Sequence, residues 1–173
     1  SIAIGNNRAW EELERQALSD PLTGLPNRRA FDGRLASEAL RCSRRGEPLG
    51  VAVVDLDEFK VVNDEHGHGA GDEVLLEVAR RLAAAARGDE LVARIGGEEF
   101  GVVMPACRSA DAWGPGERLR RAIGGEAFPG GLVLTASVGV CVGAGSAIDG
   151  AGLLEAADRA LYRAKRQGRD RVV

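Results

Sequence analysis

Residues 49–57 read Leu49-Gly50-Val51-Ala52-Val53-Val54-Asp55-Leu56-Asp57, an apolar run that ends in acidic residues. A run without polar alternation is typical of a strand that is buried on both faces of a sheet. Asp55 and Asp57 are two residues apart, so a regular strand directs both side chains to the same side. A charge at the end of a buried strand is unfavourable unless a neighbouring group compensates it. This run therefore predicts the centre of a sheet and marks one end of it as a place for chemistry.

A helix is expected before this run. Phe31, Leu35, Ala39 and Leu40 recur at helical spacing, and Asn27 is a suitable N-cap for the helix that carries them. Further upstream, Trp10, Leu13 and Ala17 predict a short amphipathic helix over residues 7–18. That helix has too little apolar surface to be stable alone. Residues 1–19 are therefore expected to form a linker or dimerisation helix, and residues 20–173 a single domain.

Helices and strands alternate after the run. Residues 58–69 are expected to be irregular, and Asp72 to open a helix. Gly96-Gly97 predicts a two-residue turn between strands at 91–95 and 99–104. A further helix is expected to end over 118–123, and Gly114-Pro115-Gly116 obscures where it starts. The last expected elements are a strand at 132–142, a helix that stops at Gly168, and an edge strand at Val172-Val173. The core order β-α-β-β-α-β predicts an α+β, ferredoxin-like fold with a central antiparallel sheet flanked by helices.

Composition narrows the classes of protein. The 173 residues suit one compact domain, and the net charge of −3 argues against nucleic-acid binding, which needs a basic surplus. Cys42, Cys107 and Cys141 fit neither a zinc site nor a disulfide framework, so we expect buried thiols in the reducing cytoplasm. No apolar run approaches the length of a membrane span, and no signal peptide is visible. Because the chain begins at Ser1, we expect a piece of a longer protein, whose upstream region would provide any link to a membrane.

The acidic residues suggest a metal site. Glu98 and Glu99 follow the Gly96-Gly97 turn, and Asp55 lies near Glu98 if the first strand is next to this hairpin. Such oxygen ligands suit Mg²⁺, and two ions can stabilise both the attacking and the leaving oxygen of a phosphoryl displacement. The alternative is a solvated turn with acids at strand ends, beside an ordinary glycine hairpin.

Other polar residues also fit either a ligand-binding role or an ordinary structural one. Lys60, and Lys165 with Arg169, could contact phosphate, while Asn63 and Asp72 have the hydrogen-bonding groups to read a guanine edge. Each could equally be a surface cation, a turn residue or a charge that favours a helix dipole. His66 and His68 are interpreted as loop residues and not as metal ligands.

Five motifs in order resemble one family. They are Asp20–Arg28 (DPLTGLPNR), Asp55–Asp64 (DLDEFKVVND), Gly67–Asp72 (GHGAGD), Gly96–Phe100 (GGEEF), and Tyr162–Lys165 with Gly168-Arg169. The pentapeptide is the GGEEF variant of the signature that names the GGDEF domains, and the resemblance to this diguanylate cyclase family covers residues 20–173. It implies a nucleotidyl-cyclase-like version of the predicted fold.

The resemblance also implies a function and a role for each motif residue. Two GTP molecules would be condensed to cyclic di-GMP and pyrophosphate across a homodimer. Asp55, Glu98 and the Leu56 carbonyl would hold Mg²⁺ or Mn²⁺, two ions in each site, and Glu98 with Glu99 would activate the 3′-hydroxyl. The phosphate contacts implied are Phe59, Lys60, Lys165 and Arg169, with Lys60 also counted as catalytic, and the guanine contacts are Asn63 and Asp72.

Relatives also carry an Arg-x-x-Asp site at which the product inhibits the enzyme. Here Arg87-Gly88-Asp89-Glu90 stands at that spacing, with Glu90 in place of Asp, and Arg118 could supply a second cation. We expect weaker product inhibition from this site. Two alternatives to a cyclase remain, a non-catalytic nucleotide sensor of the same fold and a protein-interaction module.

Overall fold

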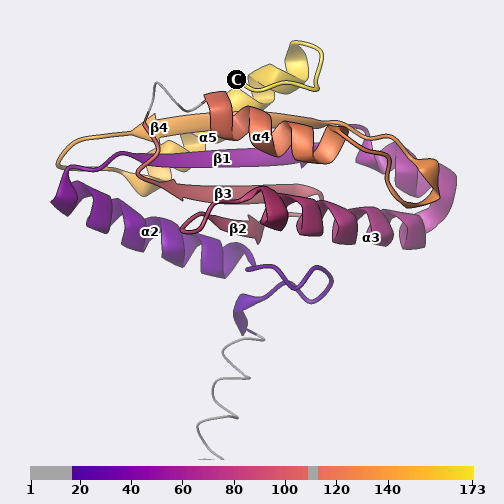
Figure 1. The fold of residues 1–173 in the computed structure, drawn as a ribbon, viewed down its shortest axis with the longest axis horizontal. Helices are drawn as coiled ribbons and strands as arrows, with labels where there is room; N and C mark the ends of the chain where they lie inside the picture. The colour runs from indigo at the N-terminus through magenta and orange to yellow at the C-terminus, as the bar shows by residue number, and fades with distance from the viewer. Residues whose placement is uncertain (1–16, 109–112) are drawn as a thin grey trace, which may run out of the picture.

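The computed structural model describes residues 17–108 and 113–173. The helices and strands are α2 (Arg28–Arg45), β1 (Leu49–Leu56), α3 (Phe59–Ala85), β2 (Leu91–Arg94), β3 (Glu99–Pro105), α4 (Trp113–Gly124), the 3₁₀ helix η2 (Pro129–Gly131), β4 (Ala136–Gly143) and α5 (Gly150–Arg166). The four strands lie side by side across the middle of the molecule (Figure 1), in the order β2-β3-β1-β4. Each neighbouring pair is antiparallel. The ferredoxin-like α+β prediction is confirmed.

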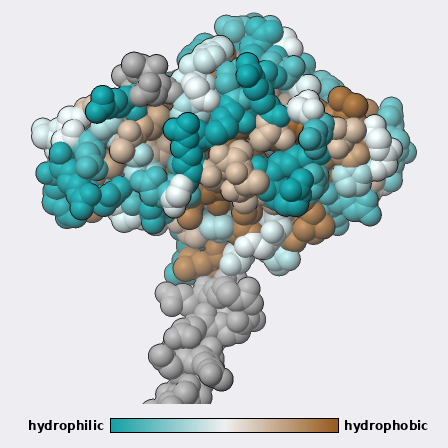
Figure 2. Space-filling view, in the orientation of Figure 1, coloured by the Kyte–Doolittle hydropathy of each residue, from teal (hydrophilic) through white to brown (hydrophobic). Residues whose placement is uncertain are grey.

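The sheet separates two apolar clusters. One contains Leu75 and Val78 of α3 with Leu119 of α4, and the other contains Phe31 of α2 with Leu161 of α5. All eight residues of β1 are buried, as expected for a strand with helices on both faces. The outer surface is mainly hydrophilic on the face that Figure 2 shows. No helix of residues 17–108 and 113–173 is both long and apolar enough to cross a bilayer.

The helix α2 agrees with its sequence signals except at one position. The Asn27 side chain accepts a hydrogen bond from the Ala30 N–H, so Asn27 is the N-cap as predicted. Phe31, Leu35 and Ala39 are buried, whereas Leu40 is 65% exposed. The assignment of Leu40 to the buried side is wrong, because one residue step rotates the helix by about 100° and turns Leu40 away from the sheet.

The segment after β1 is the main correction to the predicted elements. α3 begins at Phe59, not at Asp72, and runs to Ala85 with a single non-helical residue, Gly67, at φ 81°. Phe59 and Val62 are buried, so the first part of the helix already packs on the core. The glycines around His66 and His68 suggested a loop, but only Gly67 interrupts the helix. The two histidines are therefore exposed helical residues.

Smaller differences concern turns and element ends. β2 and β3 pair at Arg94 and Phe100, and the N–H groups of Ile95 and Gly96 both donate to the Glu99 carbonyl, so the hairpin turn is longer than two residues. β4 begins at Ala136, four residues later than predicted, and the left-handed Gly130 and Gly131 lie in the turn before Leu132.

Two further findings concern the start of α4 and the pairing of the C-terminal residues. α4 includes Gly114-Pro115-Gly116, where a proline in the first turn breaks no intrahelical hydrogen bond. Val172 makes a parallel bridge with Val138 of β4, so the predicted edge pairing is present as a bridge.

The remaining sequence expectations have mixed outcomes. Of the three cysteines, Cys42 is buried, while Cys107 and Cys141 are partly exposed. The helix expected over residues 7–18 lies almost wholly outside the described residues. Only its last two residues, Ala17 and Leu18, are described, and both are helical.

Candidate active site

The end of β1 and the signature turn meet in a small cavity. Asp55 pairs in register with Glu99 of β3 on one side and Ser137 of β4 on the other. The Leu56 N–H donates to the Glu98 carbonyl at 3.3 Å, which ties the two segments together. The resulting cavity has a volume of about 150 Å³. Its lining residues are Asp55, Leu56, Asp57, Glu58, Phe59, Lys60, Glu98, Lys165 and Arg169.

Two of the four carboxylates that line this cavity, Asp55 and Glu98, lie where burial disfavours their negative charge. Asp55 is only 4% exposed, and burial raises its pKa, although the Lys165 Nζ lies 2.7 Å from the Asp55 Oδ2 and opposes the effect. Burial also raises the pKa of Glu98, and the negative charge of Asp55 raises it further. A cation placed between them would remove both penalties.

The donor set fits a hard divalent cation. Among residues 17–108 and 113–173, no group of three or more His, Cys, Asp or Glu side chains gathers as a metal cluster. The Asp55 and Glu98 carboxylates, a backbone carbonyl and oxygens of a ligand could hold an ion here, and Mg²⁺ is usually bound by one or two carboxylates together with phosphate oxygens. The N-terminus of α3 also borders the cavity, and helix N-termini attract phosphate.

Glu99 lies in a neighbouring cavity. This second cavity has a volume of about 270 Å³ and is lined by Arg28, Ile95, Glu99, Asp158, Leu161, Tyr162 and Lys165. Lys165 borders both cavities, so a ligand that extends from one to the other would meet its ammonium group. The signature turn thus directs its two acids to different spaces. Gly96 permits this arrangement, since a Cβ there would lie 2.5 Å from the Glu99 Oε2.

Asn63 and Asp72 line neither cavity. They lie on opposite sides of the Gly67 break in α3. A Cβ at Gly71 would be 2.0 Å from the Asn63 Oδ1, so the absence of a side chain at Gly71 lets Asn63 approach the residue next to Asp72. The structure therefore places Asn63 against Gly71, one residue before Asp72.

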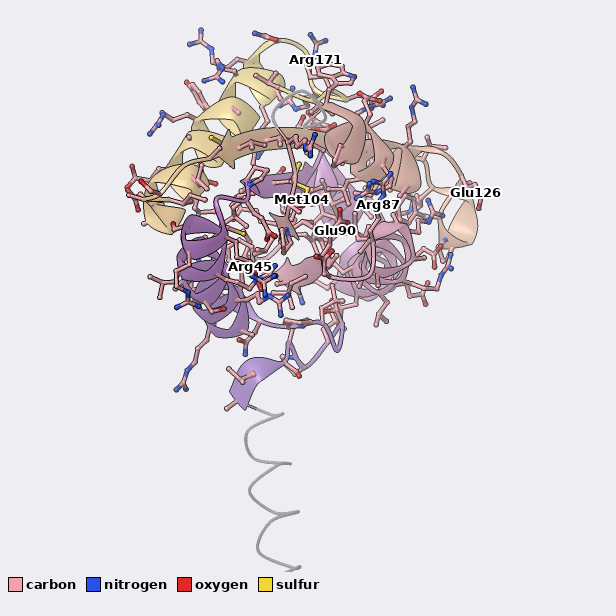
Figure 3. The ribbon with its side chains drawn as sticks, turned by 60° about the vertical axis from the view of Figure 1, so that its left-hand side comes forward. Arg45, Arg87, Glu90, Met104, Glu126 and Arg171 are labelled. Atoms are coloured by element: carbon pink, nitrogen blue, oxygen red, sulfur yellow. The ribbon has the colours of Figure 1, made fainter. Side chains whose placement is uncertain are left out.

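A third cavity holds the Arg87, Glu90 and Arg118 set. Its volume is about 660 Å³, and it lies between the start of β2 and α4. The Arg118 Nη2 donates to both oxygens of Glu90, at 2.7 and 2.6 Å, and the Arg87 N–H donates to the Glu90 Oε2 at 2.8 Å. Figure 3 shows Arg87 and Glu90 close together at this end of α3.

Asp20 and Arg94, to which the sequence assigned no role, also support the signature turn. The Arg94 guanidinium donates to the Gly97 carbonyl at 2.7 Å and to the Asp20 Oδ1 at 3.0 Å. Burial works against ionisation of Asp20, but hydrogen bonds from Thr23 and Arg94 outweigh it and lower the pKa of this carboxyl. The signal for this contact was weak, because 74 residues separate Asp20 and Arg94.

Together the fold and the cavity define a ferredoxin-like domain with an acidic, phosphate-sized site at the end of its central strand. Comparison with known proteins identifies the family: the model described as "Diguanylate cyclase, GGDEF domain" matches residues 17–171. The chain belongs to the GGDEF domain family.

Curated relatives include two well-matched proteins. The diguanylate cyclase DgcP of Pseudomonas aeruginosa is 46% identical over 167 residues, which is 94% of this chain and 24% of DgcP. The response regulator PleD of Caulobacter vibrioides is 43% identical over 162 residues, 91% of this chain and 36% of PleD. The chain therefore spans about a quarter to about a third of the length of these relatives.

Solved structures agree with the fold. The coiled coil and GGDEF domain of DgcB from Caulobacter crescentus, in complex with c-di-GMP, has a TM-score of 0.91 and 30% identity, and covers 99% of this chain and 92% of that one. Diguanylate cyclase SiaD in complex with its activator SiaC, from Pseudomonas aeruginosa, has a TM-score of 0.86 and 38% identity, with 99% and 70% coverage.

Proposed function

We propose that this chain is the catalytic domain of a diguanylate cyclase, which condenses two GTP molecules into cyclic di-GMP and pyrophosphate. The observation that carries the proposal is the cavity at the end of β1, where Asp55 and Glu98 face the cations of Lys60, Lys165 and Arg169. Acids that burial leaves in need of a cation, beside basic groups that suit a triphosphate, match the needs of metal-assisted phosphoryl transfer. The relatives named diguanylate cyclases support the same activity.

The metal ligands in this proposal are Asp55, Glu98 and the Leu56 carbonyl, which would hold two Mg²⁺ or Mn²⁺ ions. When bound, the ions would neutralise the triphosphate and acidify the attacking hydroxyl. Phe59 and Lys60 at the start of α3, and Lys165 and Arg169 at the end of α5, would hold the phosphates.

The chemical step is a nucleotidyl transfer. The 3′-oxygen of one GTP forms a bond to the α-phosphorus of the other, and the bond from that phosphorus to the leaving pyrophosphate breaks. The same step with the roles of the two nucleotides exchanged closes the ring and releases a second pyrophosphate. The proton of the 3′-hydroxyl goes to Glu98, which we assign as the general base. Glu99 is assigned to the same step as a second carboxylate, which helps to activate the 3′-hydroxyl from the adjoining cavity.

The product requires two such sites. Each domain would hold one GTP, with Asn63 and Asp72 hydrogen-bonding the guanine edge, so two chains must face each other about a two-fold axis. We assign residues 1–19 to the helix that brings the chains together and residues 20–173 to the catalytic domain. Cys42 and Cys141 are free thiols, which suits a domain that works in the cytoplasm. The Arg87, Glu90 and Arg118 cavity would bind the product as a weak inhibitor.

The test is to incubate the chain with Mg²⁺ and either GTP or ATP, and to separate the products by chromatography. Cyclic di-GMP and pyrophosphate from GTP, with little cyclic product from ATP, are expected, because Asn63 and Asp72 would leave unpaired groups against adenine. Tight GTP binding without any product would indicate a sensor. A chain that neither binds nor converts GTP would be an interaction module.

A further inference from the structure

Asp57 differs from Asp55 in the partners of its carboxylate. It is 6% exposed, and three donors already serve its oxygens. The Ser137 hydroxyl donates to the Asp57 Oδ1 at 2.7 Å, while the Thr135 hydroxyl at 2.7 Å and the Asp170 N–H at 3.0 Å donate to the Oδ2. A carboxylate with both oxygens occupied in this way is a structural acceptor and is poorly placed to ligate a metal.

The donor from Asp170 belongs to an unusual turn. After α5 the chain passes through three residues with positive φ, at 114° for Gly168, 60° for Arg169 and 44° for Asp170. Side chains other than glycine rarely adopt this region, and such conformations persist only where the surroundings hold them. Asp57 holds the backbone of Asp170, and the Arg120 guanidinium holds its side chain.

The turn places Arg169 at the active-site cavity. The Arg169 side chain lines this cavity together with Asp55 and Glu98, and its Nη2 lies 3.2 Å from the Glu58 Oε1. Arg169 occupies the middle of the positive-φ segment, so the path of the backbone decides where its guanidinium enters. Loss of the Asp57 hydrogen bond would loosen that path and leave it to Arg120 and to the bond from the Arg169 N–H to the Ala164 carbonyl.

We propose that Asp57 is a positioning residue that holds the 168–170 turn, so that Arg169 reaches the nucleotide triphosphate. The inference rests on the proposed function, because it takes the triphosphate to bind in this cavity. Asp57 acts through Arg169 and contributes no ligand to the metal. This role accounts for the contacts of Asp57, the first acid after β1, with Thr135, Ser137 and the turn after α5.

The test is a double-mutant cycle on nucleotide affinity. The dissociation constant of a non-hydrolysable GTP analogue is measured with Mg²⁺ for the wild type, Asp57→Ala, Arg169→Ala and the double variant. Each single change is expected to weaken binding by about 10-fold, the usual weight of one charge-assisted hydrogen bond. The double variant should bind no more weakly than Arg169→Ala, because the first effect passes through the second residue. Effects that multiply in the double variant would overturn the proposal.

Asp57→Asn provides the matched control. Its amide oxygen can accept from Thr135 and Asp170, and its amide nitrogen can donate to the Ser137 hydroxyl, which is able to accept. The analogue should therefore bind this variant within about threefold of the wild type, a difference well under the weight of one hydrogen bond. A metal-ligand role predicts instead that Asp57→Asn is as defective as Asp57→Ala, and that result would overturn the inference.

A second variant covers the case in which Asp57→Ala does not fold, as judged by circular dichroism. Thr135→Val removes one hydroxyl donor with little change in volume, and should give a smaller loss that again disappears in the Arg169→Ala background. A loss that persists there would count against the proposal. A wild-type chain that binds no analogue would overturn the proposed function and this inference with it. If the wild type binds the analogue but the losses in affinity from the two single substitutions multiply in the double variant, only this inference is overturned.

Discussion

The cavity at the end of β1 and the cavity between β2 and α4 both combine acids with basic side chains. They differ in how far the fold itself compensates the negative charge of those acids. In the first, burial raises the pKa of Asp55 and of Glu98, and the nearby Lys165 offsets this rise only in part. In the second, both oxygens of Glu90 accept from Arg118, and one also accepts from the Arg87 N–H. The first cavity compensates its acids only in part, through Lys165, while in the second both oxygens of the acid are already hydrogen-bonded.

This contrast separates two kinds of site that look alike in sequence. Both consist of an acid near an arginine or a lysine, in a turn beside a strand. The difference is whether the acid is already satisfied by the fold. An unsatisfied acid costs stability and gains from a ligand, whereas a satisfied acid must give up existing hydrogen bonds before a ligand can bind.

The largest expected effect is on turnover. Glu98→Gln removes the charge that would bind the metal and accept the proton, so cyclic di-GMP synthesis should fall by at least about 100-fold, the usual weight of a general base. Glu90→Gln is the matched control at the satisfied acid and should retain turnover within a fewfold when the product is kept low. The rates of pyrophosphate release compare the two. Near-normal turnover in Glu98→Gln would remove the proposed role of that residue.

A smaller effect is expected on product inhibition. Glu90→Asp shortens the side chain by one methylene, which weakens its hold on Arg118 and frees that guanidinium for the product. Inhibition by added cyclic di-GMP should tighten by about 10-fold, as for one hydrogen-bonded group. The inhibitor concentration for half activity measures this. Arg87→Ala should lose the inhibition, and if it is inhibited as strongly as the wild type, the cavity is not the inhibitory site.

The smallest effect concerns stability and pH. Burial raises the pKa of Glu98 in the folded chain above the ordinary value of 4.5, so the unfolded chain loses this proton first. The wild type is therefore destabilised as the pH rises from 4.5 through the folded pKa, and that penalty remains at higher pH. Without metal, Glu98→Gln should be more stable than the wild type at pH 7, and the gain should vanish well below pH 4.5.

Urea unfolding at the two pH values measures the difference. Glu90→Gln should behave in the opposite way and lose stability at pH 7, because it breaks the pair with Arg118. A Glu98→Gln chain that is less stable than the wild type at pH 7 would show that the fold already compensates the Glu98 charge.

The features that the sequence predicted are those with local causes. The apolar run of β1, the Asn27 cap and the motif residues of the end-of-β1 cavity all depend on short stretches of chain. The start of α3 was missed because glycines around Gly67 hide a helix that packs through Phe59 and Val62. Composition alone does not tell a helix with one break from a loop.

Partners that are distant in the sequence could not be predicted either. The hydrogen-bond partners of Asp57 are Thr135, Ser137 and Asp170, which follow it in the sequence by 78, 80 and 113 positions. No spacing rule relates Asp57 to them. The same holds for Glu90 and Arg118, which are 28 positions apart. The sequence indicated which residues carry charge, but only the packing of β4, α4 and the C-terminal turn decides which charges are already satisfied.

Cation binding tests this distinction most directly. Mn²⁺ is titrated into the wild type, Glu98→Gln and Glu90→Gln with a non-hydrolysable GTP analogue present, and free Mn²⁺ is followed by electron paramagnetic resonance. Glu98→Gln should bind Mn²⁺ more weakly by about 10-fold or more, the range seen when a metal site loses one supporting group. Glu90→Gln should bind it as the wild type does. Equal Mn²⁺ affinity in the wild type and Glu98→Gln, or an equal loss in both variants, would contradict the account.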